Sequence, residues 1–131
     1  MTPSELVRGL YLDCVNPRVL DKLPEYLSER FVGANGESGP LGFRKTIERM
    51  VTAFPDLRFE LDDLFSVRSK VCVRWRFEAV HLGFLSGIPP TGRTAVQQGI
   101  GIYEARSGKL VRAWLQVDRL GVLQQIGAVS I

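Results

Sequence analysis

The spacing of apolar side chains changes once along this chain, from a helical period to an alternating one. Before residue 55, apolar residues recur three and four positions apart, which is typical of helices with one buried face. After residue 57 they alternate with polar residues, which is typical of strands with one buried face. The change predicts helices first and a meander of antiparallel strands second, so the fold class is α+β.

The N-terminal part is predicted to be helical. Thr2-Pro3-Ser4-Glu5 forms a helix start, because Thr2 can accept a backbone hydrogen bond and Glu5 stands where a capping box needs it. The expected segments are a helix from residue 2 to residue 16, one or two short helices over 18–31, a loop over 32–40 and a helix over 41–54.

The second part is predicted to hold four long strands joined by turns and one glycine- and proline-rich connection. The expected strands cover residues 58–65, 71–81, 94–103 and 110–118, with the connection over 82–92 and a short closing helix or turn over 120–126. Helices that cover one side of a strongly curved sheet are the arrangement that this order favours.

The last strand carries an unusual set of side chains on one of its faces. The two faces hold Val111, Ala113, Leu115 and Val117 on one side, and Arg112, Trp114, Gln116 and Asp118 on the other. The apolar face is predicted to pack against helices. The other face, with a tryptophan, an amide and a carboxylate in line, is predicted to line a pocket with Asp118 as the ionisable group at its depth. The alternative is a half-buried edge strand in which Asp118 caps the following segment.

Composition and charge exclude several classes of partner. A chain of 131 residues is the size of one domain, predicted here to be residues 1–131. The net charge of +3 comes from scattered basic residues, so we expect no nucleic-acid partner. One histidine and no close cluster of ligands predict no metal site, and no apolar run reaches the length needed to span a membrane. Two cysteines favour free thiols in a reducing cytoplasm.

Three motifs resemble a known family. They are Phe54-Pro55-Asp56-Leu57, the segment from His81 through Gly87-Ile88-Pro89-Pro90-Thr91-Gly92-Arg93, and Trp114-x-x-x-Asp118. Together they resemble the SnoaL-like polyketide cyclases, which belong to the nuclear transport factor two-like superfamily. The resemblance runs from about residue 42 to residue 127, and the first forty residues match only in their helical character.

The resemblance implies a cone made of a curved sheet wrapped by helices, with one apolar cavity at its wide end. It also implies a homodimer or larger homo-oligomer, a polyketide or polycyclic aromatic ester as substrate, and no cofactor. In such cyclases an aspartate at the position of Asp118 is the general acid/base that allows a ring to close by intramolecular aldol addition. A carboxylate in an apolar cavity is poorly solvated, which raises its pKa and suits this role.

Further candidate residues follow from their chemistry. His81 is the second candidate catalytic residue, because it can hydrogen-bond an enolate or an aldol oxygen. The candidate substrate contacts are Tyr11, Trp75, Phe84, Gln98, Arg112, Trp114 and Gln116. The alternatives are that His81 anchors the following loop through its ring nitrogens, that the tryptophans form only the wall, and that Tyr11 belongs to the core.

Two departures from the family pattern widen the range of functions. The loop that commonly carries a histidine reads Val32-Gly33-Ala34-Asn35, and Arg112 stands where an acidic residue is often found. An arginine near carboxylates is similar to the arrangement in limonene-epoxide-hydrolase-like members of the superfamily. The alternatives to a cyclase are therefore a hydroxylase, epoxide hydrolase or isomerase with the same cavity, and a non-catalytic module that binds a small molecule.

Overall fold

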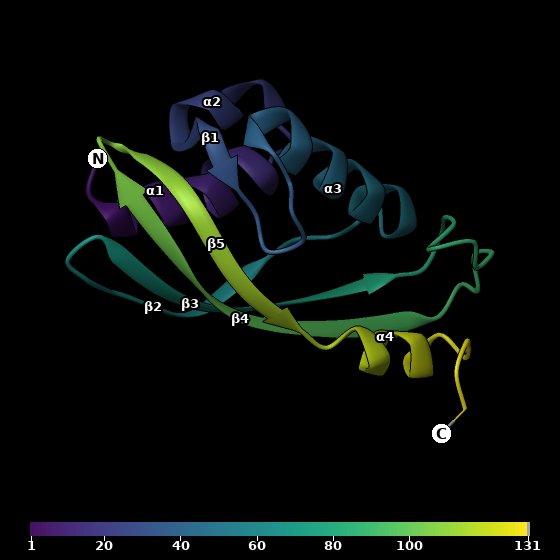
Figure 1. Ribbon diagram of the computed structural model, residues 1–131. Helices are drawn as coiled ribbons and strands as arrows, with labels where there is room; N and C mark the ends of the chain where they lie inside the picture. The colour runs from purple at the N-terminus through teal and green to yellow at the C-terminus, as the bar shows by residue number, and fades with distance from the viewer. Residues whose placement is uncertain (131) are drawn as a thin grey trace.

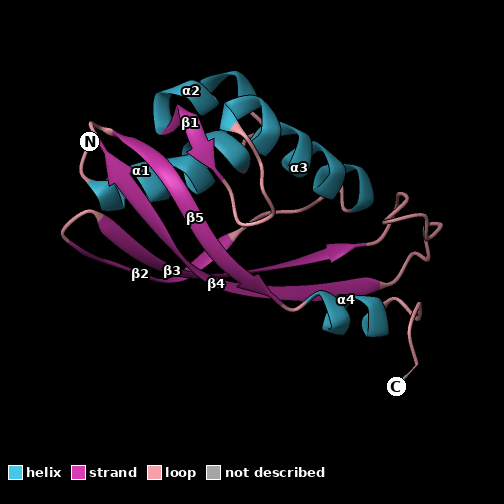
Figure 2. Cartoon of the chain, in the orientation of Figure 1, coloured by secondary structure: helices cyan, strands magenta, loops and turns pink. Residues whose placement is uncertain are grey.

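The computed structural model describes residues 1–130 (Figure 1). Its helical segments are α1 Pro3–Gly9, the π-helical turn η1 Leu10–Val15, the 3-10 turn η2 Leu20–Lys22, α2 Leu23–Tyr26, α3 Gly39–Ala53 and α4 Arg119–Gln125. Its strands are β1 Leu27–Val32, β2 Glu60–Val67, β3 Lys70–Val80, β4 Thr94–Arg106 and β5 Lys109–Val117. The predicted α+β class, with helices before a strand meander, is confirmed (Figure 2).

The first helical segment begins where the capping box predicts. The Glu5 amide donates to the Thr2 hydroxyl, and the Thr2 amide donates to the Glu5 carboxylate. The helix continues without a break into η1, whose wider turn rotates the following side chains relative to an α-helix. Leu10, Tyr11 and Cys14 of this turn are buried as a result.

The sheet has five strands in the order β1-β5-β4-β3-β2, and β1 runs parallel to β5 while the other pairs are antiparallel. One or two short helices were predicted over residues 18–31, but residues 27–32 form strand β1, so the prediction is wrong for this segment. Leu27 and Phe31 are its two fully buried apolar residues, and their spacing of four is the spacing of a helix. A register shift between Leu27 and Val32 produces that spacing in a strand. Pairing with β5 therefore overrides the local pattern.

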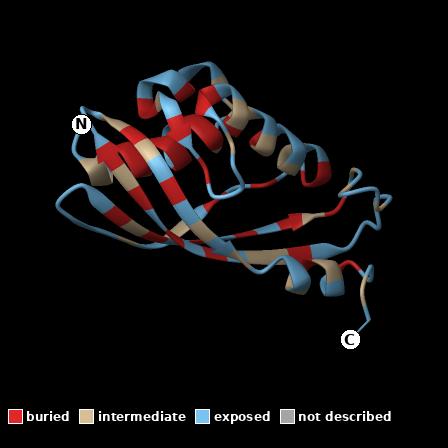
Figure 3. Cartoon of the chain, viewed as in Figure 1, coloured by how far each residue is buried: buried red, intermediate tan, exposed pale blue. Residues whose placement is uncertain are grey.

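Helices α1, α2 and α3 all lie over one face of the strongly curved sheet, and α4 lies on its other side near the end of β5 (Figure 1). We call the face under α1–α3 the concave face and the opposite face the outer face. Buried residues gather between the helices and the concave face, whereas the outer face is largely exposed (Figure 3). Within residues 1–130, no helix combines the length and the apolar character needed to cross a membrane.

Candidate functional site

Strand β5 alternates as predicted, but its polar face is the outer one. Ala113 is buried and Leu115 and Val117 are half-buried on the concave face, which confirms that this side packs toward the helices. Trp114 is 44% exposed, and Arg112 and Gln116 are also exposed. The prediction that this face lines a pocket holds for Arg112 and Trp114, which line an open hollow on the outer face. That hollow is separate from the concave face, because α1–α3 cover only the other side of the sheet.

One residue that was predicted to face the helices, Val111, does not take the buried position expected for it. The register between β4 and β5 shifts opposite Glu104 and Ala105, so Leu110 pairs with Ala105 and Arg112 with Glu104. Val111 is the extra residue between them, and Leu110 takes the buried position. A bulge of this kind cannot be read from alternation alone.

Asp118 lies at the end of β5 and is exposed. Its Oδ1 accepts a hydrogen bond from the Gly121 amide at 2.9 Å, which makes it the N-cap of α4. The predicted position at the depth of a pocket is therefore wrong. Of the alternative, the capping by Asp118 is confirmed, whereas β5 is not an edge strand, because it lies between β1 and β4. A role for Asp118 in turnover remains a prediction, since capping occupies only one of its carboxylate oxygens.

Two other predicted contacts also lie away from the concave face. Gln98 is exposed opposite Arg76 on the outer face, and its neighbour Gln97 is half-buried opposite Phe77 on the concave face. Phe84 is 63% exposed in the connection between β3 and β4. A shift of one residue along a strand exchanges the two faces, so the glutamine that could meet a ligand inside the cone is Gln97.

The concave face is lined by a continuous series of aromatic rings. Neighbouring rings have centroids 4.8 to 6.2 Å apart, and the series runs Tyr103, Tyr11, Phe59, Trp75, Phe77, Phe54, His81. All seven side chains are buried. The structure therefore brings three predicted site residues, Tyr11, Trp75 and His81, onto one wall. Trp75 occupies a wall position and Tyr11 a core position, which are the alternatives to substrate contact that were predicted for them.

Tyr11 and Tyr103 form a buried pair at one end of this wall. Their hydroxyl oxygens lie 2.6 Å apart. Burial raises the pKa of Tyr11 to about 12, and the hydrogen bond with Tyr103 acts in the opposite direction. Burial also raises the pKa of Tyr103 well above its ordinary value, as does the proximity of Tyr11. Both hydroxyls therefore remain protonated at neutral pH and can serve as hydrogen-bond donors.

These pKa shifts predict a loss of stability in alkaline solution. The folded protein holds both phenolic protons more tightly than the unfolded chain, so the stabilisation is complete below about pH 10 and is lost as the pH rises toward 12. The expected loss is up to about 1.4 kcal/mol per pH unit and per tyrosine. Urea unfolding at about pH 8 and about pH 11 measures it. Full tyrosinate absorbance in a protein that is still folded at about pH 11 would contradict the prediction.

His81 has one ring nitrogen fixed and one without a partner. The Thr91 amide donates to Nδ1 at 3.2 Å, and the Thr91 hydroxyl lies 3.0 Å from the same atom. The predicted alternative, that His81 anchors the loop that follows it, is confirmed by these bonds. Because an amide can only donate, Nδ1 is the acceptor and the ring proton is on Nε2. That Nε2–H is fully buried and has no acceptor among the described residues.

Trp75 carries the second buried donor of this kind. Its ring lies across Gly99 of the neighbouring strand, where any Cβ would overlap Cζ2 and Cε2 of the indole. The indole Nε1–H is buried and, within residues 1–130, has no acceptor at hydrogen-bond distance. Its polar neighbour is the Tyr11 hydroxyl, whose pKa burial raises and the indole lowers. A glycine in the middle of a strand often marks a close approach of this kind. Gly99 was thus a signal in the sequence for this part of the site.

Comparisons with known proteins show which family this chain belongs to. The family model described as SnoaL-like polyketide cyclase matches residues 5–126. The chain belongs to the SnoaL-like polyketide cyclase family. The match begins in α1 and ends just after α4. It therefore includes the N-terminal helices of this SnoaL-like protein, which the sequence motifs did not cover.

Solved structures give the same result at the level of the fold. TsrD from Streptomyces laurentii is 29% identical, with a TM-score of 0.83 over 97% of this chain and 93% of that one. A SnoaL-like polyketide cyclase from Agrobacterium tumefaciens is 24% identical, with a TM-score of 0.83 over 97% of this chain and 99% of that one. The search of curated proteins gave no match.

Proposed function

We propose that this SnoaL-like protein is a polyketide cyclase that needs no cofactor and closes a ring in a carbonyl-rich polyketide ester by intramolecular aldol addition. The observation that supports the proposal is the pair of buried donors on the aromatic wall, Trp75 Nε1–H and His81 Nε2–H. Leaving such a group buried and unpaired costs about 1–3 kcal/mol. A substrate rich in carbonyl acceptors would remove that cost on binding.

The spacing of the two donors indicates an extended substrate. Trp75 and His81 are six residues apart on the same face of β3 and its continuation, which corresponds to about 20 Å along a strand. One oxyanion cannot reach both donors over that length. Each donor would therefore meet a different carbonyl oxygen, while the flat rings between them would contact the body of the substrate. Either donor would form a stronger hydrogen bond with the negatively charged oxygen of an enolate than with the neutral oxygen of a ketone.

The reaction balances without a further reactant. A base removes a proton from a carbon that lies between two carbonyl groups. The resulting enolate carbon then bonds to the carbon of another carbonyl group, here called the second carbonyl, elsewhere in the same molecule. The oxygen of that second carbonyl then takes up a proton and becomes a hydroxyl. We assign both proton transfers to Asp118, whose carboxylate is open to solvent directly after the half-buried Val117 of the concave face.

One observation favours a different function, a module that binds a polyketide without changing it. The residues that β3, β4 and β5 present to the concave face are apolar side chains, glycines, one glutamine and one tyrosine, with no carboxylate among them. A base would then have to act from outside this face, as Asp118 does in the proposal above.

Three variants separate these possibilities with an anthraquinone-type polyketide methyl ester as the probe. We expect Asp118→Asn to lower turnover by about 10²-fold or more and to leave the dissociation constant unchanged. We expect Trp75→Phe to weaken binding about tenfold, because it loses one buried hydrogen bond. His81→Phe should weaken binding at least as much, because it also removes the Nδ1 acceptor that holds Thr91. Calorimetric binding and product formation by mass spectrometry measure the two effects.

The matched control is Gln98→Ala, which removes an exposed glutamine from the outer face. It should change neither binding nor turnover. Binding that weakens in Trp75→Phe without turnover by the unmodified protein would establish the binding module instead. Equal binding by all variants would remove the concave face from the function.

A further inference from the structure

A hollow lies on the other side of the sheet and is independent of the concave face. Its volume is about 560 Å³, and its lining includes Ser107 of the turn between β4 and β5. Its walls come from the outer face of β1, the end of β4 and the first half of β5. The lining residues are Ser28, Arg30, Val32, Glu104, Arg106, Ser107, Val111, Arg112 and Trp114. We call this hollow the arginine groove.

The groove gathers positive charge that the protein does not neutralise. Arg30, Arg106 and Arg112 line it, and Glu104 is its single acidic residue. Among the residues that the structure describes, none of these three guanidinium groups forms an ion pair. All three side chains are exposed, so solvent screens their mutual repulsion, and a bound anion would lower it further.

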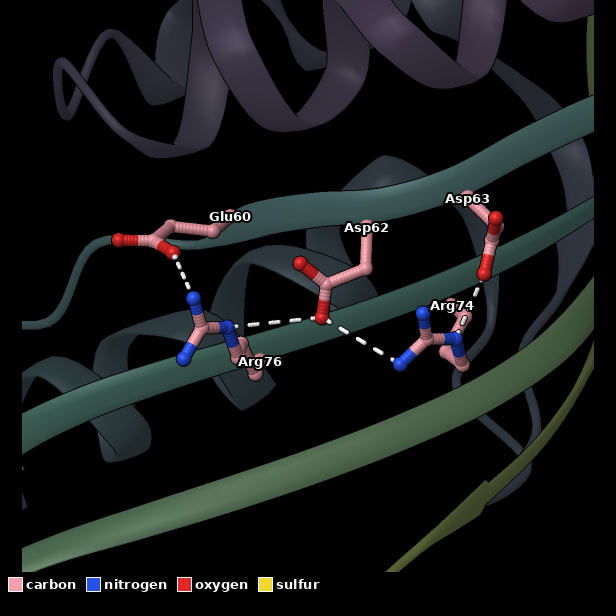
Figure 4. Close-up of polar contacts among 5 residues, drawn as sticks. All are labelled: Glu60, Asp62, Asp63, Arg74 and Arg76. Carbon is pink, nitrogen blue, oxygen red and sulfur yellow. Dashed lines mark hydrogen bonds and ion pairs between the residues drawn. The ribbon is translucent and has the colours of Figure 1, made fainter.

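Other arginines of the same outer face are paired. Figure 4 shows Arg74 and Arg76 of β3 between three carboxylates of β2. Arg76 lies 3.0 Å from Glu60 and 3.5 Å from Asp62, and Arg74 lies 2.7 Å from Asp63 and 3.5 Å from Asp62. The groove arginines thus differ from Arg74 and Arg76, the arginines of β3 on the same face.

One arginine of the groove, Arg112, stacks on a neighbouring aromatic ring. The Arg112 guanidinium lies 5.3 Å from the centre of the Trp114 ring, and the Lys70 ammonium lies 5.6 Å from the same ring. Stacking on an aromatic face limits the movement of a guanidinium and leaves its N–H groups free to donate in the plane. Arg112 is therefore oriented in advance for a bidentate contact with an oxyanion.

We propose that the arginine groove binds the phosphate group of a small phosphomonoester. Three guanidinium groups match an anion with three terminal oxygens and two negative charges better than they match a carboxylate. The hydroxyls of Ser28 and Ser107 are further donors within the groove, and Glu104 opposes the binding of anions. The groove is larger than a phosphate ion, so Val32, Val111 and Trp114 would contact the organic part of the ligand.

Calorimetric titration with phenyl phosphate tests the proposal, with benzoate as a monoanion of similar size. We expect phenyl phosphate to bind at least tenfold more tightly than benzoate and to bind more weakly as salt is added. Arg112→Gln should weaken the binding of phenyl phosphate at least tenfold. Arg74→Gln is the matched control, since it removes the same charge from the same face at a paired position, and it should change binding less than about threefold.

Two outcomes would overturn the proposal. Equal weakening by Arg112→Gln and Arg74→Gln would show that only net charge attracts the anion. Absence of binding at about 10 mM phenyl phosphate would show that the groove takes no phosphate. Size-exclusion chromatography of both variants then shows whether a second copy of the chain covers the groove instead. Because the groove and the concave face lie on opposite sides of the sheet, the aldol proposal stands or falls separately.

Discussion

Replacing Gly83 with alanine is expected to destabilise the protein by about 3 kcal/mol. A Cβ at this position would overlap the carbonyl oxygen of Thr52, a backbone atom that cannot rotate away. The amides of Leu82 and Gly83 both donate to the Ala53 carbonyl, and these bonds hold the 82–93 connection against the end of α3. Alanine would push the two segments apart and weaken both bonds. Urea unfolding monitored by circular dichroism measures the change.

The control for this substitution is Leu82→Ala, at the adjacent position. The Leu82 side chain is 56% exposed, so its loss should change stability by about 0.5 kcal/mol or less. The same connection carries Thr91, which orients His81, and we therefore expect Gly83→Ala also to weaken binding of the anthraquinone ester. A Gly83→Ala protein as stable as the unmodified one would show that α3 and the connection adjust easily.

Removing either hydroxyl of the buried tyrosine pair is expected to cost about 1–3 kcal/mol. Tyr11→Phe leaves the Tyr103 hydroxyl buried with no other hydrogen-bond partner among the described residues. Tyr103→Phe leaves the Tyr11 hydroxyl with only the indole of Trp75 as a polar neighbour. The double variant removes both polar groups, so its cost should be clearly less than the sum of the single ones. A double-mutant cycle from urea unfolding gives the coupling energy, which we expect to be about 1–2 kcal/mol.

Tyr26→Phe provides the comparison for this cycle. Tyr26 is 7% exposed, and no hydrogen bond of its hydroxyl to another described residue is present. Its substitution should change stability by about 0.5 kcal/mol or less. Additive effects of Tyr11→Phe and Tyr103→Phe would mean that the two hydroxyls do not depend on each other.

The sequence determined the order of elements and most of their limits, because period and turn chemistry are local properties. The capping box at Thr2 and the strand meander needed no information from distant residues. The motifs around His81 and Trp114 also indicated the family that the comparisons confirm. Strand β1 was the exception, since its buried residues repeat every four positions and its partner β5 is distant in sequence.

Only the tertiary structure decided which face of β5 meets the helices. Alternation separates two sets of side chains but does not say which set a distant helix will cover, so Trp114 was assigned to an interior that it does not enter. The same limit applies to function. The pairing of Tyr11 with Tyr103, the unpaired donors of Trp75 and His81, and the arginine groove each join residues from separate elements. Their proximity depends on how the sheet curves and which strands pair, and neither is written in any local stretch of the chain.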